Sequence, residues 1–267
     1  GKSIRALAVD PRNSRRIAFA APDGRILEST DFGTNWTLRH RVEGFASCVA
    51  YSPQGKLFAA TSNGLIRFDK QPRTVLSQGV RAIAFSRTRA YAAAAGAGVW
   101  ASTDGSNNWK STSLKTEKGQ EWLDVAVSKQ NPDRVQAIAA AGWGGAHAWS
   151  ADGGKSWKRT TQIRADATWN PTDLELAKAG PVNLSNPRNL ALSPVDDRMA
   201  MIAANWRPAL SNDGGATWRE SSRGADISVV TDIQFHEGKS YVTAMDEGLF
   251  VSDDSPLGWR QLFPLRW

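Results

Sequence analysis

Three arginines occupy the same place in three predicted strands. Arg5, Arg81 and Arg188 each stand four residues before the last apolar residue of a strand-like run. Guanidinium groups bind carboxylates and phosphates through paired hydrogen bonds, so three that converge would form an anion site. Like charges repel, and salt bridges to Asp124 and Asp232 would offset that repulsion. The sequence leaves both outcomes open, an anion site or a set of ion pairs.

A second group of side chains suits stacking against a ligand. Trp143 and His147 lie in AGWGGAH, Trp206 and Arg207 lie in ANWRP, and Trp169 lies in the long segment RADATWNPTDLELAKAGPVN. Tryptophan among glycine and polar residues can stack on sugar rings or hold a peptide. The alternative is that these tryptophans pack the long segment onto the rest of the fold. We predict a ligand site that combines these five residues with the three arginines.

Catalysis by a glycoside hydrolase would need two carboxyl groups that flank the scissile bond. The acidic residues near the ends of predicted strands that could supply them are Glu121, Asp124, Asp232, Asp246 and Glu247. No spacing singles out a pair among them. A tyrosine nucleophile would need a nearby glutamate, and all three tyrosines lie within predicted strands. Catalytic residues therefore stay unknown, and hydrolysis is the alternative to binding.

The sequence offers no metal or cofactor motif. Cys48 is the single cysteine, so it can form neither an internal disulfide nor a cysteine-based zinc site. His40, His147 and His236 are far apart and lack the spacing of metal ligands. No run approaches 18 apolar residues, so no membrane span is expected. We expect neither a metal nor a cofactor.

Positive charge is concentrated in the first third of the chain. Residues 1–89 hold 12 arginines and 3 lysines against 6 acidic residues, a net charge of +9, whereas the whole chain carries +7. The basic residues that fall in predicted turns there are Arg12, Arg15, Arg16, Lys56, Lys70, Arg73, Arg87 and Arg89. No aromatic residues are interleaved with them, which argues against a single-stranded nucleic acid partner. An acidic ligand or a merely soluble basic surface would explain the charge.

An eight-residue pattern occurs five times and ends in tryptophan each time. It reads STDFGTNW (29–36), STDGSNNW (102–109), SADGGKSW (150–157), SNDGGATW (211–218) and SDDSPLGW (252–259). Aspartate in a tight hairpin accepts hydrogen bonds from turn N–H groups, glycine permits positive φ, and tryptophan covers the turn. We therefore predict a structural role for Asp31, Trp36, Asp104, Trp109, Asp152, Trp157, Asp213, Trp218 and Trp259. In the irregular fifth copy the aspartate is Asp254 or Asp253.

Short apolar runs separated by turn residues fill the rest of the chain. Val9, Tyr51, Phe85, Val127, Leu192 and Phe235 end equivalent runs, at steps of 42, 34, 42, 65 and 43 residues. Six units of about 40 residues with four strands each are typical of a β-propeller. A sandwich would give no reason for a repeated hairpin at this spacing. The sequence predicts an all-β fold, a single propeller of six four-stranded blades, or seven if a blade has been removed.

The predicted blades divide the chain at about 1–44, 45–79, 80–119, 120–180, 181–225 and 226–267, which together form one domain. The second unit has lost its box, and residues 62–75 are expected to keep a third strand and a turn only. An insertion of about 20 residues, from about Ile163 to Asn186, accounts for the longest step. It holds one weak helical candidate, TDLELAKAG (172–180). In a propeller, its connection lies on the same face as the segments that carry Trp143 and Trp206.

The box segments resemble the Asp-box, or BNR repeat, of sialidases, sortilin-type receptors, xyloglucanases and photosystem II assembly factors. The resemblance implies a propeller, with the boxes on outer hairpins remote from the ligand. It also implies two classes of function. One is a non-catalytic, extracytoplasmic binding or scaffold protein for a peptide, protein or glycan ligand, and the other is a glycoside hydrolase. The Arg-Ile-Pro motif of sialidases is absent, which favours binding. We expect an acidic ligand and a monomeric protein that is periplasmic, secreted or lumenal.

Overall fold

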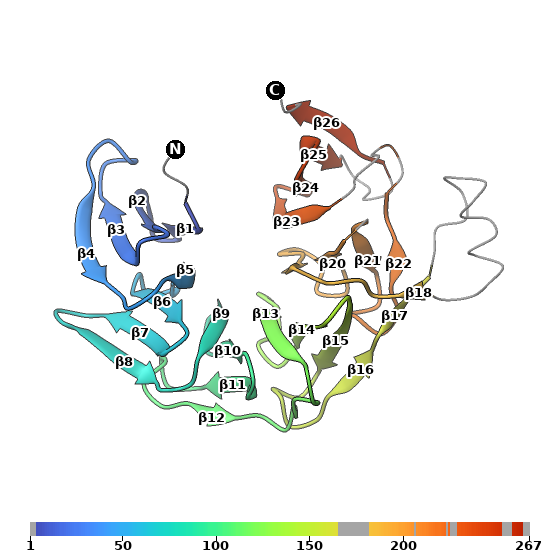
Figure 1. Cartoon of the computed structure of the whole chain (residues 1–267), viewed down its shortest axis with the longest axis horizontal. Helices are drawn as coiled ribbons and strands as arrows, with labels where there is room; N and C mark the ends of the chain where they lie inside the picture. Colours follow the sequence, from blue (N-terminus) through green and yellow to red (C-terminus); the bar gives the residue numbers. More distant parts are fainter. Residues whose placement is uncertain are drawn as a thin grey trace. The chain divides into compact units, whose positions relative to one another are not determined.

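The computed structural model describes residues 4–164, 182–205, 207–222, 224, 229–252 and 258–263. The described residues are all-β and form six four-stranded antiparallel sheets, so the predicted six-bladed propeller class is confirmed. The chain divides into two compact units, residues 1–116 (unit 1) and 117–267 (unit 2). Figure 1 shows the strands of each blade side by side in chain order.

Unit 1 contains three blades. Blade 1 consists of β1 (Ala6–Asp10), β2 (Asn13–Ala20), β3 (Arg25–Ser29) and β4 (Thr37–Arg41). Blade 2 consists of β5 (Ala46–Tyr51), β6 (Leu57–Thr61), β7 (Gly64–Phe68) and β8 (Pro72–Leu76). Blade 3 consists of β9 (Val80–Phe85), β10 (Ala90–Ala94), β11 (Gly98–Ser102) and β12 (Lys110–Ser111).

Unit 2 contains the other three blades. Blade 4 consists of β13 (Glu121–Val127), β14 (Val135–Ala141), β15 (Gly144–Ser150) and β16 (Lys158–Thr160). Blade 5 consists of β19 (Asn189–Leu192), β20 (Ala200–Ala203), β21 (Ala209–Ser211) and β22 (Arg219–Glu220). Blade 6 consists of β23 (Val230–His236), β24 (Lys239–Ala244), β25 (Gly248–Ser252) and β26 (Arg260–Phe263).

The structure corrects the expectation for the second unit of the repeat. Residues 62–75 were expected to hold a third strand and a turn only, but β8 pairs with β7 and completes the blade. Pro72 opens β8, a position where the missing backbone N–H is tolerated. The loss of the box therefore removes the turn motif without removing the strand.

A small sheet closes the base of the predicted insertion. Here β17 (Gln162–Ile163) pairs with β18 (Val182–Asn183), with Gln162 opposite Asn183. The next chain segment is fixed as well, because the Leu184 N–H donates to the Thr161 carbonyl at 2.7 Å. The helical candidate at 172–180 lies outside the described residues.

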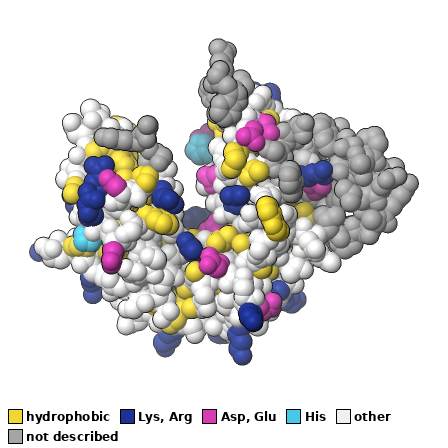
Figure 2. Space-filling view, viewed as in Figure 1, with side chains coloured by type: hydrophobic (Ala, Val, Ile, Leu, Met, Phe, Trp, Pro, Cys, Tyr) yellow, Lys and Arg dark blue, Asp and Glu magenta, His cyan; other side chains and the backbone are white. Residues whose placement is uncertain are grey.

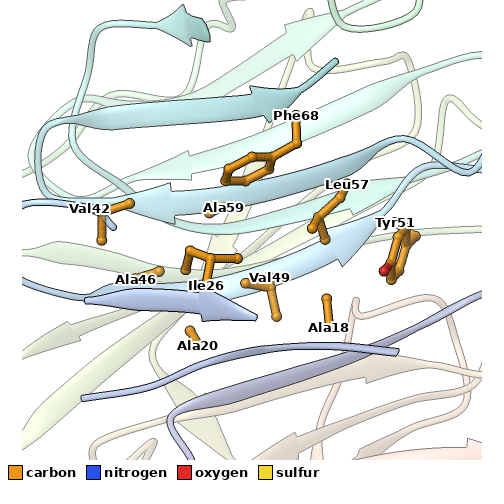
Figure 3. Close-up of a cluster of buried hydrophobic side chains, with 10 residues drawn as sticks. All are labelled: Ala18, Ala20, Ile26, Val42, Ala46, Val49, Tyr51, Leu57, Ala59 and Phe68. Atoms are coloured by element: carbon orange, nitrogen blue, oxygen red, sulfur yellow. The ribbon is translucent and has the colours of Figure 1, made fainter. Parts of the chain in front are cut away.

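The second strands of the inner blades, β6, β10, β14 and β20, are largely buried on both faces, and in β6 and β20 the side chains alternate between two neighbouring blades of the same unit. In β6, Leu57 and Ala59 pack towards blade 1, whereas Phe58 and Ala60 pack towards blade 3. Figure 3 shows the first of these interfaces, where Leu57 and Ala59 meet the blade 1 side chain of Ile26. In unit 2, β20 repeats the arrangement between blades 4 and 6. Burying one such large aliphatic side chain is worth about 1.5–3 kcal/mol.

The first four box turns are held by the same set of hydrogen bonds. In SADGGKSW, Ser150 Oγ donates to Asp152 Oδ1 at 2.7 Å and accepts from the Gly154 N–H at 2.9 Å. The Ser156 N–H donates to Asp152 Oδ1 at 2.9 Å, and its hydroxyl donates to Asp152 Oδ2 at 2.5 Å. Equivalent bonds surround Asp31, Asp104 and Asp213. Asp253 and Asp254 lie outside the described residues.

The closing tryptophans cover these turns to different degrees. Trp157 and Trp218 donate their indole N–H to the turn carbonyls of Gly154 and Gly215, at 3.2 and 3.1 Å. Trp36 packs edge-on against Phe19 with ring centroids 4.6 Å apart. Trp109 packs on the core between blades 2 and 3, and Trp259 is buried and donates to the Ser221 carbonyl at 2.8 Å.

We predict that Asp152→Ala destabilises the fold by about 1–3 kcal/mol, because it removes the acceptor for three turn donors. Those donors lower the pKa of the Asp152 carboxyl to about 2, the Ser156 hydroxyl contributing most. Its stabilising effect is therefore present above the unfolded pKa near 4 and is lost as pH falls towards 2. Urea unfolding at pH 7 measures the change. Glu43→Ala, which loses one exposed side-chain hydrogen bond, should cost far less; equal losses would contradict the structural role of the box.

Candidate functional site

The first strands of unit 1 begin with an ordered polar edge. The Arg5 guanidinium lies 3.9 Å from the centre of the Phe45 ring, a cation–π contact. Ser47 Oγ donates to the backbone carbonyl of Arg81 at 2.8 Å, which ties blade 2 to blade 3. Ser47 and Arg81 are both extra residues in β-bulges, and bulges redirect side chains away from the regular ladder. Contact of Arg5 and Arg81 with a ligand stays a prediction.

Arg188 begins the equivalent edge of unit 2. Its N–H donates to the Ala203 carbonyl at 2.8 Å, and its Nε donates to Asn205 Oδ1 at 3.2 Å. The Asn205 N–H in turn donates to the Ser185 carbonyl at 3.0 Å. Within unit 2, Arg188 is thus oriented by an amide and not by the carboxylates of Asp124 or Asp232. The convergence of Arg188 with Arg5 and Arg81 involves both units and stays a prediction.

Asp124 is held between two blades. Its Oδ2 accepts from the Leu190 N–H at 2.8 Å and from Asn189 Nδ2 at 3.2 Å, and its Oδ1 accepts from the Val125 N–H at 2.8 Å. Although the residue is only half-buried, its carboxyl group is enclosed, and this burial raises its pKa to about 7. The nearby Asp232 charge raises it further. The Asp124 carboxyl can therefore exchange a proton near neutral pH.

Asn189 continues this chain of hydrogen bonds into blade 6. Its Oδ1 accepts from the Ile233 N–H at 3.0 Å, and the same N–H is bonded to Asp232 Oδ1 at 2.9 Å. Burial also raises the pKa of the Asp232 carboxyl. Two carboxyl groups with raised pKa values thus lie on the first strands of blades 4 and 6, with Asn189 between them. Asp124 and Asp232 were among the candidate acids, but the amide that links them was not expected.

Trp143 is the most exposed large apolar residue among those described, with 81% of its surface accessible. Gly142 and Trp143 form the turn that connects β14 to β15. The Trp143 carbonyl accepts from the Asn186 N–H at 3.1 Å and from Ser185 Oγ at 3.3 Å. The backbone of the turn is thus held by the chain that returns from the insertion, while the indole stays open to solvent. Packing of the Trp143 ring into a local core is therefore excluded for the described residues.

His147 requires a correction, because it lies within β15 and not in a loop. The residue is completely buried, with Nε2 2.8 Å from Gln136 Oε1. Trp218 Nε1 donates to His147 Nδ1 at 3.1 Å, so Nε2 must carry the ring proton and donate to Gln136. Gln136 Nε2 then donates to the Gly214 carbonyl at 3.1 Å. The imidazole therefore joins blade 4 to the box turn of blade 5 and offers no surface to a ligand.

Arg207 is engaged inside blade 5. Its guanidinium forms an ion pair with Glu220, a buried carboxylate that also accepts from Ser222 Oγ at 2.7 Å. The Arg207 guanidinium therefore has a structural role inside blade 5, which makes it a weaker candidate for ligand binding than the sequence predicts. Trp206 and Trp169, the remaining predicted stacking residues, lie outside the described residues.

A tyrosine and a glutamate meet in unit 1, a pairing that the sequence did not indicate. Tyr51 Oη donates to Glu28 Oε1 at 2.6 Å, and Arg16 bridges Glu28 and Asp10 at 2.7 and 2.6 Å. Burial, followed by the hydrogen bond to Glu28, raises the pKa of the Tyr51 phenol. A nucleophilic tyrosine would need the opposite shift. This network therefore ties blade 1 to blade 2.

Among the described residues, no three His, Cys, Asp or Glu side chains gather into a group that could hold a metal ion. In the same part of the chain, no helix has the length and hydropathy to span a membrane.

No protein-family model matches the chain, and no curated protein matches it. Solved structures do. YCF48 bound to a D1 peptide is 16% identical with a TM-score of 0.60, covering 94% of this chain and 78% of its own. A GH74 xyloglucanase from Xanthomonas campestris is 15% identical with a TM-score of 0.62, covering 97% and 52%. The WD40 propeller domain of Doa1 is 16% identical with a TM-score of 0.71, covering 99% and 83%. The chain thus spans about half of the xyloglucanase, and these likenesses show the fold alone.

The neutral, buried His147 predicts a pH-dependent stability. Burial lowers the pKa of its imidazole to about 3, well below the value near 6.5 expected in the unfolded chain. Its contribution is therefore complete above pH 6.5 and declines as pH falls towards 3, by about 2 kcal/mol at pH 5. In His147→Gln, the difference in unfolding free energy between pH 7.5 and pH 5 should shrink accordingly.

His236→Gln is the matched control for that measurement, because the His236 side chain is 72% exposed. It should leave the pH dependence of unfolding unchanged. Equal pH dependence in His147→Gln and the parent protein would contradict the assignment of a neutral imidazole.

Proposed function

We propose that the protein is a non-catalytic binding or scaffold propeller. The exposed Trp143 carries this proposal, because its indole is open to solvent while its backbone is fixed by Ser185 and Asn186. A pre-positioned aromatic ring costs little ordering entropy when a ligand stacks on it. The ligand is a peptide, a protein segment or a glycan.

Arginines at the strand starts indicate the charge of that ligand. Arg5 and Arg81 in unit 1 and Arg188 in unit 2 hold equivalent positions, and residues 1–89 carry a net charge of +9. An acidic ligand would be attracted to this edge and would pair with its guanidinium groups. We further propose a monomer that acts outside the cytoplasm, on the resemblance of its boxes to those of extracytoplasmic propellers.

Asp124 and Asp232 favour one second candidate, a glycoside hydrolase. A carboxyl group with a pKa near 7 is what a general acid at neutral pH requires, and a second carboxyl, that of Asp232, lies on blade 6, beyond the intervening Asn189 of blade 5. Against this, three N–H donors already occupy the Asp124 oxygens. The xyloglucanase similar to this chain is itself about twice as long.

Trp143→Ala tests the binding role. Titration of the parent protein with a panel of acidic peptides and acidic oligosaccharides should change its tryptophan fluorescence, and the substitution should abolish that change. The melting temperature should stay nearly constant, because an exposed ring contributes little packing. Val195→Ala removes a similarly exposed apolar side chain, 69% accessible, and should leave binding intact. Unchanged binding by Trp143→Ala would contradict the proposal.

Arg81→Ala tests the acidic character of the ligand. Affinity for the responding acidic ligand should fall with rising salt and should fall about tenfold in this variant. Arg198→Ala is the control, since Arg198 is 69% exposed and lies in the turn between β19 and β20, at the other end of the strands. Equal losses in both variants would show general charge attraction and contradict a specific arginine site.

A further inference from the structure

A pocket of about 310 Å³ opens at the turn ends of blades 2 and 3, within unit 1. Its polar lining comes from three separate turns: Gln54 from blade 2, Arg87, Thr88 and Arg89 from blade 3, and Thr103 and Ser106 from the box of blade 3. These turns lie at the end of the strands opposite to Arg81. In the view of Figure 2, basic side chains lie among hydrophobic ones over unit 1.

The pocket arises from a difference in turn length. In blade 3 the Ser86 N–H donates to the Arg89 carbonyl at 2.9 Å, so only Arg87 and Thr88 stand at the tip. In blade 2 the Ser52 N–H donates to the Lys56 carbonyl at 2.8 Å, which makes that turn one residue longer. The shorter turn leaves space beside the longer one, and both Arg87 and Thr88 are exposed there.

Ser106 forms a strained part of the pocket wall. Its φ is 66°, in the left-handed region, where the equivalent residues of the other three described boxes are glycines: Gly33, Gly154 and Gly215. A side chain in this conformation costs about 1–2 kcal/mol. The Ser106 N–H and carbonyl are both bonded, but in the described part of the chain its hydroxyl has no hydrogen-bond partner. Strain of this kind concentrates where a side chain contacts a ligand.

The wall is braced from blade 2, which lacks a box of its own. Arg67, whose side chain is 5% exposed, donates to Asn107 Oδ1 at 2.8 Å and to the Ser106 carbonyl at 3.4 Å. Asp69 fixes Arg67 from the other side at 2.7 Å. The backbone of this wall at Ser106 is therefore fixed from blade 2.

The charge of the pocket suits an anion. Arg87 is exposed and forms no ion pair within the described residues. The one carboxylate in the lining, Asp104, is already bonded by Ser102 and by the N–H groups of Asn107 and Asn108. These bonds, that of the Asn108 N–H first, hold the pKa of the Asp104 carboxyl far below its usual range. Asp104 is itself exposed and stays ionised, so the lining carries Arg87 and Arg89 against one carboxylate and has a net positive charge.

We propose that this pocket binds a small acidic carbohydrate, the size of one hexose with a phosphate or carboxylate group. Its volume is at the lower end of that of small-molecule sites and fits one sugar ring. Arg87 pairs with the anionic group, while the Ser106 and Thr103 hydroxyls and the Gln54 amide bond the sugar hydroxyls. The pocket lies at the opposite end of the blade 3 strands from Arg81.

Isothermal titration with glucose 6-phosphate and with glucuronate tests the proposal, with glucose and inorganic phosphate as partial ligands. At least one acidic sugar should bind saturably and more tightly than either partial ligand. Arg87→Ala should weaken that binding at least about tenfold, since it removes a charge-assisted pair. Arg198→Ala, at an exposed arginine in unit 2, should leave it unchanged. Binding of inorganic phosphate as tight as that of the sugar would overturn the carbohydrate assignment.

Ser106→Gly should change stability and sugar affinity in opposite directions. It should raise the melting temperature by a few degrees because it relieves the positive-φ strain, and it should weaken the acidic sugar severalfold because it removes the hydroxyl. A variant that is more stable and binds equally well would exclude Ser106 from the site. Trp143→Ala should leave sugar binding intact; a loss there with none in Arg87→Ala would place the sugar at the other edge and overturn this proposal. Failure of Trp143→Ala to affect peptide or oligosaccharide binding bears only on the proposed function.

Discussion

The packing of consecutive four-stranded sheets constrains every other feature of this protein. A single blade has two apolar faces. The side chains of the second strand of an inner blade must therefore pack against one neighbouring blade on each face. This explains why β6 and β20 read LFAAT and AMIA, in which small alanines let the sheets approach closely. Because both faces of these strands are buried, side chains that could meet a ligand come from the other strands and from the turns.

Two kinds of polar contact connect blades without disturbing this packing. In unit 1, Arg16 and Tyr51 meet Glu28 between blades 1 and 2. In unit 2, His147 reaches Trp218 between blades 4 and 5. Each buried group has its partners, which is the condition for polar side chains inside a packed interface. The His147 contact also explains a residue that the sequence alone assigns to a ligand site.

The two units differ at one repeated position of the first strand. It is filled by Ala6, Cys48 and Ala82 in unit 1, and by Asp124, Asn189 and Asp232 in unit 2. The polar residues of unit 2 use their side chains to bond backbone N–H groups of their own or the next first strand, as Asp124 does with Leu190. Unit 1 lacks these links and carries Arg5 and Arg81 one residue earlier. Unit 2 keeps one arginine at that earlier place, Arg188, so its edge combines a cation with these N–H to oxygen links.

The sequence predicts the blades well because their signal is local: alternating apolar runs, turn residues and a recurrent box. It fails where a structural role depends on a neighbouring blade. His147 follows two glycines and looks like part of a loop, yet β15 begins at Gly144 and carries it inwards. Arg207 looks free until Glu220 is seen beside it. The pocket beside Arg87 depends on the lengths of two turns 34 residues apart, for which no motif exists.

The most direct test of the account is whether the protein holds a ligand without transforming it. An immobilised panel of peptides and oligosaccharides, incubated with the protein and followed by chromatography of the released material, answers this in one measurement. We expect the protein to bind an acidic ligand of the panel, and we expect the released material to contain no new reducing ends and no shortened saccharides. Release of saccharide fragments, lost in Asp124→Asn while that variant remains folded, would contradict it and establish hydrolysis instead.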